Sequence, residues 1–119
     1  MTTRAVRTAS LIGAPTDIGA SDRGASMGPE ALRVAGIHAA LSQRGLDVVD
    51  CGNVSGPPNP GLIKANGYRN LAQVTAWNLE VHDAVYRELG EHRLPILLGG
   101  DHSLSIGSIA APRASRGCG

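Results

Sequence analysis

Apolar residues along the chain fall into two patterns: short continuous runs, and longer stretches with helical spacing. The continuous runs cover residues 9–14, 46–50 and 94–98, and glycine, proline or polar residues flank them, which predicts three buried strands. Helical spacing covers residues 28–44 and 70–91, which predicts two helices. Strands and helices that alternate with short connections are typical of a parallel α/β fold with right-handed crossovers.

The remaining segments predict irregular structure. Residues 51–67 contain the run Gly-Pro-Pro-Asn-Pro-Gly, which predicts a surface loop. A further helix is expected to begin after Ser103, but Pro112 interrupts it and no apolar period follows, so residues 110–119 are expected to form a disordered tail. A length of 119 residues is enough for one domain at most.

Composition and charge restrict the class of partner. The 11 lysines and arginines against 10 aspartates and glutamates give a net charge of +1, which favours neither nucleic acid nor an anionic membrane as a partner. The apolar stretch near the N-terminus is too short for a signal peptide or a membrane span, so we expect a cytoplasmic protein. Cys51 and Cys118 lack the spacing of a disulfide framework or a thiolate zinc site.

Residues suited to chemistry gather where the last predicted strand ends, in the sequence Gly99-Gly100-Asp101-His102. Polar residues at the carboxyl ends of strands in open α/β sheets are candidates for function. A neutral imidazole beside a carboxylate suits manganese, zinc or iron, so His102 is either a metal ligand or a polar cap at the strand end. The other histidines are expected on solvent-exposed helix surfaces: His38, His82 and His92.

A glycine-rich loop at residues 19–29 precedes the first predicted helix. It has neither the GxGxxG pattern nor the lysine of a P-loop, so it does not indicate nucleotide binding. Asp22 and Arg23 in this loop are expected to stabilise the chain geometry by pairing with each other or with neighbouring loops.

Four motifs occur in a fixed order along residues 10–109: Gly13-Ala-Pro-Thr-Asp-Ile-Gly19, Asp22-Arg-Gly-Ala-Ser-Met-Gly-Pro-Glu-Ala-Leu-Arg33, Asp50-Cys-Gly-Asn53 and Leu97-Leu-Gly-Gly-Asp-His-Ser-Leu-Ser-Ile-Gly-Ser108. In this order and at this spacing they resemble the arginase family of ureohydrolases. The Asp-Arg-Gly sequence that begins at Asp22 is more similar to arginases than to agmatinases, which usually place a proline near that glycine.

The resemblance implies a doubly wound parallel sheet with flanking helices. This chain would hold an N-terminal fragment of it, about three strands with the first between the other two. Residues 1–109 would then form a partial arginase-like α/β domain, and residues 110–119 a disordered tail outside the family pattern. Family members are usually homo-oligomers.

The resemblance also implies a reaction and a cofactor. Two Mn²⁺ ions at the carboxyl edge of the sheet lower the pKa of a bridging water, and the hydroxide attacks the guanidinium carbon of L-arginine to give urea and L-ornithine. By position, His102 matches the first metal ligand of this site. Asp101 matches its neighbour, for which we expect a supporting role only.

The chain departs from the family after this motif. The family's Asp-Ala-His-x-Asp cluster and Asp-x-Asp pair, which supply the other ligands, are absent, and so are the family's substrate-binding positions. We therefore assign no catalytic or substrate-binding residue, because one imidazole cannot hold two metal ions. The change of composition past Ile109 suggests the hypothesis of a truncation or a shifted reading frame.

Three functions remain open. The first is arginase-type hydrolysis, with this chain inactive alone. The second is a catalytically inert fragment that acts only by association, because its third strand would present an unpaired apolar edge. The third is an agmatinase or another guanidino-acid hydrolase.

Overall fold

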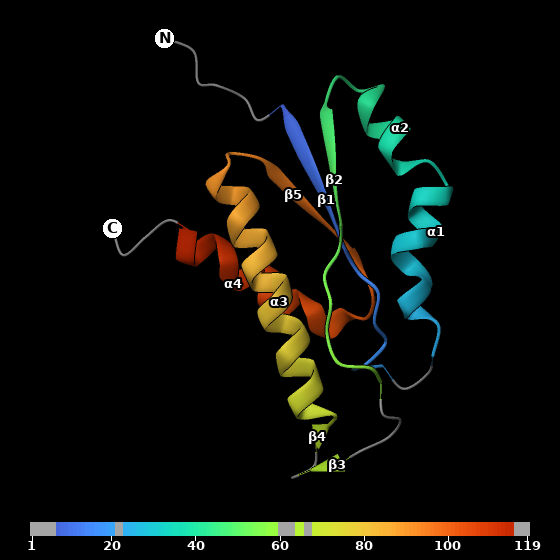
Figure 1. The fold of residues 1–119 in the computed structure, drawn as a ribbon, viewed down its shortest axis with the longest axis vertical. Helices are drawn as coiled ribbons and strands as arrows, with labels where there is room; N and C mark the ends of the chain where they lie inside the picture. The colour runs from blue at the N-terminus through green and yellow to red at the C-terminus, as the bar shows by residue number, and fades with distance from the viewer. Residues whose placement is uncertain (1–6, 21–22, 60–63, 66–67, 116–119) are drawn as a thin grey trace.

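The protein forms a three-stranded parallel sheet with flanking helices. The computed structural model describes residues 7–20, 23–59, 64–65 and 68–115. Strand β1 (Thr8–Ala14) lies between β2 (Asp47–Asn53) and β5 (Leu94–Gly99), and both pairs are parallel (Figure 1). The predicted fold class and the predicted central position of the first strand are therefore confirmed.

Strand β1 is apolar because it is enclosed on every side. Ala9 pairs with Val48 of β2 and with Leu94 of β5. Leu11 and Ile12 are almost fully buried. A parallel strand that is covered on both faces needs a continuous apolar run rather than an alternating one, which is the pattern in this sequence.

The first helical region consists of two short helices rather than one, so the expectation of a continuous helix over residues 28–44 was wrong. Helix α1 (Gly28–Val34) ends before Gly36, and α2 (Ile37–Ser42) follows. Gly36 adopts a φ of 97°, in the left-handed region that glycine tolerates and that interrupts an α-helix. Val34 is 81% exposed, so much of the expected apolar face has no covering element.

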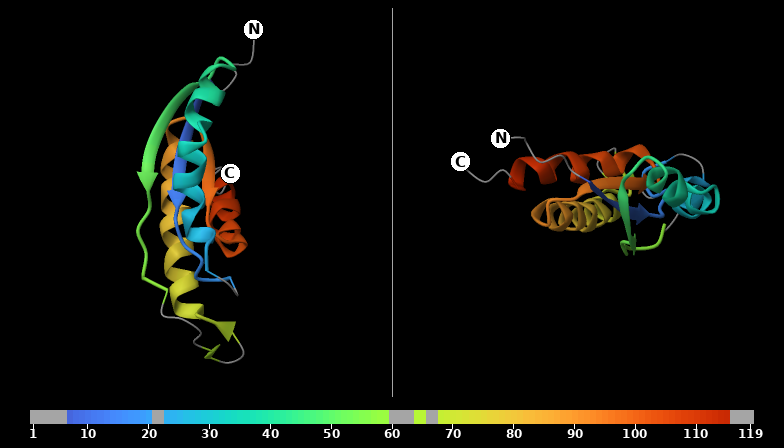
Figure 2. Two further views of the ribbon diagram at one scale, coloured as in Figure 1. Left: turned by 90° about the vertical axis from the view of Figure 1, so that its right-hand side faces the viewer. Right: turned by 90° about the horizontal axis from the view of Figure 1, so that it is seen from above.

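Helix α3 (Leu71–Gly90) agrees with the predicted second helix and carries the centre of the core. It packs extensively against α4 (Ser105–Ser115) and also contacts β1 and β5. Figure 1 shows α1 and α2 beside β2, and α3 and α4 on the other side of the molecule. Figure 2 shows that the molecule is thin along the viewing direction of Figure 1. The core cluster joins the end of β1, α3 and α4 through these residues: Ile12, Ala14, Ile18, Trp77, Val81, Ala84, Val85, Leu104 and Ala111.

Two segments that were expected to be irregular contain regular structure. Helix α4 continues through Pro112 to Ser115, so residues 110–115 are helical instead of forming a disordered tail; residues 116–119 lie outside the described part of the chain. Strand β2 continues to Asn53, and β3 (Lys64–Ala65) pairs with β4 (Tyr68–Arg69). The surface loop over residues 51–67 is therefore shorter than predicted.

Arg33 connects α1 to the end of β2. Its guanidinium donates two hydrogen bonds to the Asp50 carboxylate, at 2.9 and 3.0 Å, and a third to Asn53 Oδ1 at 2.7 Å. These hydrogen bonds from Arg33 are the main reason that the pKa of Asp50 lies below its ordinary value. Gly13 of β1 lies against the Asn53 side chain: a Cβ at position 13 would approach Asn53 Oδ1 to 1.9 Å. Three of the four sequence motifs thus meet at one contact.

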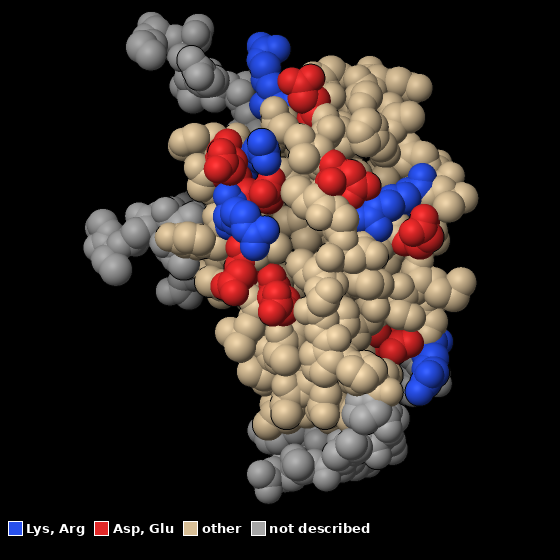
Figure 3. Space-filling model, viewed as in Figure 1, with Lys and Arg blue, Asp and Glu red and all other residues tan. Residues whose placement is uncertain are grey.

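The surface carries both signs of charge. Figure 3 shows acidic and basic side chains interspersed on the face in view, without a large area of one sign. Among the helices of the described residues, none is long and apolar enough to cross a membrane.

Candidate metal-binding turn and the neighbouring pocket

The turn after β5 requires glycine. Gly100 has a φ of 65°, and a Cβ at this position would approach the backbone oxygen of Ala14 to 2.4 Å. A side chain at Gly28 would similarly lie 2.0 Å from the carbonyl oxygen of Gly99. The turn is therefore packed closely between the end of β1 and the start of α1, which places Asp101 and His102 at the carboxyl edge of the sheet.

Asp101 connects this turn to the loop that follows β1. Its carboxylate accepts hydrogen bonds from the backbone N–H of Gly19 at 3.0 Å, from the backbone N–H of Ser103 at 2.8 Å and from the Ser103 hydroxyl. Its own N–H donates to the carbonyl of Thr16 at 3.1 Å. The carboxylate is occupied by donors of the protein, which fits the supporting role expected for it.

His102 begins the short 3-10 helix His102–Leu104 and is exposed at the rim of the sheet. Its position agrees with the edge at which a parallel sheet presents ligand-binding groups. The residues that the structure describes contain no group of three or more His, Cys, Asp or Glu side chains that could hold a metal ion. The donor set present here does not fit a complete metal site, and the role of His102 as a ligand stays a prediction.

The other histidines lie away from this turn on helical or loop surfaces. His82 is stacked on Tyr86 in α3 and lies 3.4 Å from the Asp83 carboxylate. His38 in α2 and His92 after α3 are exposed. Cys51 is an exposed free thiol on β2, whereas Cys118 and Asp22 lie outside the described residues.

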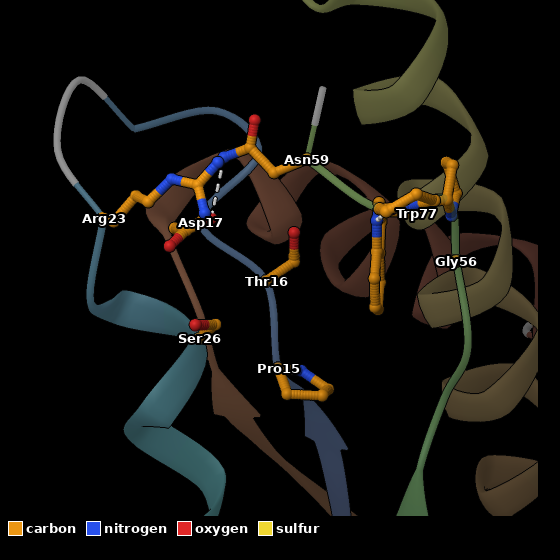
Figure 4. A pocket seen from close by; sticks show the side chains of 10 residues that line it. Pro15, Thr16, Asp17, Arg23, Ser26, Gly56, Asn59 and Trp77 are labelled. Atoms are coloured by element: carbon orange, nitrogen blue, oxygen red, sulfur yellow. Dashed lines mark hydrogen bonds between the residues drawn. The ribbon is translucent and has the colours of Figure 1, made fainter. Parts of the chain in front are cut away.

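A polar pocket of about 390 Å³ lies beside the turn, where the end of β1 meets the loop over residues 56–59. Figure 4 shows Thr16 near the middle of this pocket, with Arg23 and Trp77 on opposite sides. No local sequence pattern predicts this pocket, because its walls come from segments far apart in the chain: Pro15, Thr16, Asp17, Arg23, Ser26, Gly56, Pro57, Pro58, Asn59 and Trp77.

Asp17 fixes one wall of this pocket. It is only 6% exposed, and its two carboxylate oxygens accept hydrogen bonds from the Asn59 amide at 2.8 Å and the Gly24 N–H at 3.0 Å. The hydrogen bond from Asn59, followed by that from Gly24, holds the pKa of Asp17 below its ordinary value. The position and ionisation of Asp17 thus tie the loop after β1 to the loop after β2.

Trp77 fixes the opposite wall. Its Nε1 donates a hydrogen bond to the carbonyl of Pro57 at 2.8 Å, and a Cβ at Gly56 would lie 2.5 Å from the indole ring. Only a residue without a side chain lets the chain pass this close to the ring. The indole of α3 is therefore held in one orientation by the loop that it contacts.

A second buried polar group joins α3 to the sheet, away from the turn. The Glu88 carboxylate accepts hydrogen bonds from Ser10 Oγ at 2.7 Å and from Arg93 Nη1 at 2.9 Å, and Glu88 is 6% exposed. Burial opposes ionisation of Glu88, but the hydrogen bonds outweigh it and the pKa stays below its ordinary value. The Cys51 residue as a whole is exposed, but partial burial of its thiol group beside Glu88 raises the pKa of that thiol. The cluster stabilises an ionised carboxylate inside the fold.

The described fold matches solved structures of arginases. The native arginase from Bacillus caldovelox superposes with a TM-score of 0.81 at 35% identity, over 89% of this chain and 36% of that one. The Entamoeba histolytica arginase, solved in complex with L-ornithine, gives 0.80 at 27% identity, over 94% and 38% of the chains. A formiminoglutamase variant from Trypanosoma cruzi, solved with Mn²⁺, shares the fold alone, with a TM-score of 0.59 at 19% identity over 87% and 34% of the chains. The fold therefore belongs to the class of arginases and their structural relatives.

Sequence comparison gives the family. The profile of the arginase family matches residues 7–117 and so extends beyond Ser108, where the last of the four motifs ends. The arginase of Bacillus subtilis strain 168 is 40% identical over 105 residues, covering 87% of this chain and 35% of the relative. That of Agrobacterium fabrum is 34% identical over 106 residues, covering 88% and 33%. The chain belongs to the arginase family, and it spans about a third of the length of the curated relatives it matches.

Proposed function

We propose that this chain is the N-terminal portion of an enzyme that hydrolyses the guanidino group of L-arginine to urea and L-ornithine. The observation that carries the proposal is the Gly99-Gly100-Asp101-His102 turn at the carboxyl edge of the sheet, in a chain 40% identical to a bacterial arginase. The solved complex of the Entamoeba histolytica relative with L-ornithine, a product of this reaction, supports the same substrate class.

Manganese is the proposed cofactor, and His102 is the ligand that this segment would contribute. The described residues do not complete a metal site, so we derive no catalytic step from a bound ion. The proposed contribution of this segment is to hold His102 in position. Gly100 allows the turn, and Asp101 fixes it against the loop after β1, so that the imidazole of His102 stays at the rim. We expect the 119 residues alone to be inactive, because one imidazole cannot hold two metal ions.

A second candidate function is association without catalysis. Among the described strands, β5 pairs only with β1, and Leu94 on it is 47% exposed. Ile106 and Ile109 on α4 are 67% and 66% exposed. An apolar strand edge without a partner favours pairing with another polypeptide. Agmatinase or guanidino-acid hydrolase activity is the third candidate, and the Asp-Arg-Gly sequence that begins at Asp22 favours arginase over it.

The first experiment measures urea release from L-arginine by the purified 119-residue chain with added Mn²⁺. We expect no urea above the protein-free blank, because a single imidazole cannot hold the metal pair. Turnover by the pure chain would contradict the proposal that further residues are required, and it would also exclude the inert association function.

The second experiment tests the substrate. Residues 7–109 replace the matching segment of the Bacillus subtilis arginase, and the chimera is assayed with L-arginine and agmatine. We expect urea from L-arginine only. In the chimera, His102→Ala should lower the bound manganese measured by elemental analysis, whereas His92→Ala, at an exposed site away from the turn, should not. A folded chimera that prefers agmatine, or an unchanged metal content in the His102 variant, would overturn the assignment.

A further inference from the structure

We propose that the pocket between Arg23 and Trp77 binds a small organic carboxylate. The carboxylate would lie on the Arg23 guanidinium, and the organic part would lie against the Trp77 indole. The inference goes beyond the proposed function, because no pocket residue matches a metal-ligand position. It rests on three features of the pocket: an available cation, a fixed aromatic wall and a volume of about 390 Å³.

The cation is Arg23. It is exposed, and no carboxylate of the described residues lies within ion-pairing distance of it. Asp17 attracts Arg23 from further away, but both Asp17 oxygens already accept hydrogen bonds from Asn59 and Gly24. The five N–H donors of a guanidinium form a planar fork that matches the two oxygens of a carboxylate.

Two hydroxyl groups add donors near the same position. Ser26 lines the pocket below Arg23, and Thr16 lies between Arg23 and Trp77 (Figure 4). The Thr16 oxygen accepts a hydrogen bond from the Ile18 N–H at 3.1 Å, which leaves its own proton available to donate. The donors on this side therefore suit an anion, and a cationic ligand would meet the charge of Arg23.

The opposite wall is apolar. The indole Nε1 of Trp77 is already hydrogen-bonded to the Pro57 carbonyl, so the ring offers its face and not its polar atom. Pro15, Pro57 and Pro58 extend this apolar surface. A flat or aliphatic body would therefore be buried here, which distinguishes the ligand from inorganic phosphate or sulfate.

The net charge favours a monoanion. One guanidinium, partly offset by the ionised Asp17, balances a single negative charge better than two. Aliphatic monocarboxylates and the α-carboxylates of free amino acids share this chemistry. Binding experiments with both kinds of molecule separate the two sources, because only the amino acids bring an ammonium group into the pocket.

The chain provides its own probe, because Trp77 is the single tryptophan in the sequence. The 119-residue protein is titrated with hexanoate, L-leucine, L-ornithine and hexanamide, and the fluorescence of Trp77 is recorded. We expect a saturable change with hexanoate or with the amino acids, and binding of neutral hexanamide weaker by about tenfold or more, since a charge-assisted hydrogen bond is lost. Absence of a saturable change with every carboxylate, or equal binding of hexanamide, would overturn the proposal.

Variants separate specific binding from general charge effects. Arg23→Gln should weaken the best carboxylate by about tenfold, whereas Arg44→Gln, at an exposed arginine after α2, should leave it unchanged. Ser26→Ala should give a smaller loss. Both arginines are exposed, so neither variant should alter the circular dichroism spectrum. Equal effects of Arg23→Gln and Arg44→Gln would show that the fluorescence change reports net charge and would refute the site.

Discussion

Replacing Glu88 by glutamine perturbs the buried polar group between α3 and the sheet without changing its size. The Glu88 carboxylate accepts hydrogen bonds from Ser10 at 2.7 Å and Arg93 at 2.9 Å. A hydrogen bond to a charged group contributes about 1.5–3 kcal/mol and a neutral one about 0.5–1.5 kcal/mol, so the bond from Ser10 should lose about 1 kcal/mol. Water offsets part of the loss at Arg93, whose side chain is 34% exposed. We expect the free energy of unfolding at pH 7 to fall by about 1–2 kcal/mol.

The same substitution has a pH dependence with a definite sign. The hydrogen bonds to Glu88 hold its pKa in the folded protein below the ordinary value of 4.5. A carboxyl whose folded-state pKa is lowered stabilises the fold above its unfolded pKa, and this contribution is lost as the pH falls through the folded pKa. Glutamine does not titrate. The difference in stability between the two proteins should therefore be complete near pH 7 and shrink below 4.5.

Urea unfolding measures both effects, followed by Trp77 fluorescence and far-UV circular dichroism at neutral and acidic pH. Glu80→Gln is the matched control, because Glu80 lies on the same helix but is exposed, and it should change stability by less than about 0.5 kcal/mol. A Glu88→Gln protein as stable as the parent at pH 7, or a difference that persists in acid, would refute the assignment of an ionised, hydrogen-bonded carboxylate.

Two further predictions concern the turn after β5 and use the same unfolding assay. Gly100→Ala should cost at least about 2 kcal/mol, because the new Cβ would combine a left-handed backbone with a 2.4 Å approach to the Ala14 carbonyl; a change below 1 kcal/mol would contradict the close packing. Asp101→Ala should cost about 1–3 kcal/mol because its donors come from two separate segments, whereas exposed His102→Ala should stay within about 0.5 kcal/mol. Equal losses of stability in the Asp101→Ala and His102→Ala variants would argue against a structural role for Asp101 and a separate ligand role for His102.

The sequence predicted the elements that depend on local pattern. Strands β1 and β5 follow continuous apolar runs, and α3 follows a long apolar period, so their positions agree with the structure within a residue or two. The turn at Gly99-Gly100 was also visible, because adjacent glycines at a strand end indicate a backbone that no side chain can follow. These features need no knowledge of distant residues.

Two boundaries were not predictable from local pattern. The apolar spacing continues across Gly36, and only its left-handed φ of 97° separates α1 from α2. Pro112 lies inside α4, where a proline ordinarily costs about 3 kcal/mol. Packing against α3 is extensive, and the adjacent Ala111 is fully buried. Tertiary contacts therefore outweigh the local preference, and such contacts are not encoded in neighbouring residues.

The pocket and the Glu88 cluster were not predicted from the sequence, for a related reason. Each depends on pairs that are far apart in the chain, such as Trp77 with Pro57 and Glu88 with Ser10. At the level of sequence, Glu88 is one more acidic residue on a helix that carries several. Glu88 is buried only because α3 lies across β1. The apolar period of the helix does not indicate that a polar residue at this position is buried.

The central position of β1 has a consequence for synthesis. This strand is synthesised well before β5, yet Ala9 pairs with Leu94 of that strand. Until β5 has been synthesised, one edge of the strongly apolar strand β1 has no partner. The residues that pair at this edge lie far apart in the sequence. Contacts of this kind fold slowly and leave apolar segments open to aggregation. We therefore expect the nascent chain to be prone to aggregation until β5 has been synthesised and pairs with β1.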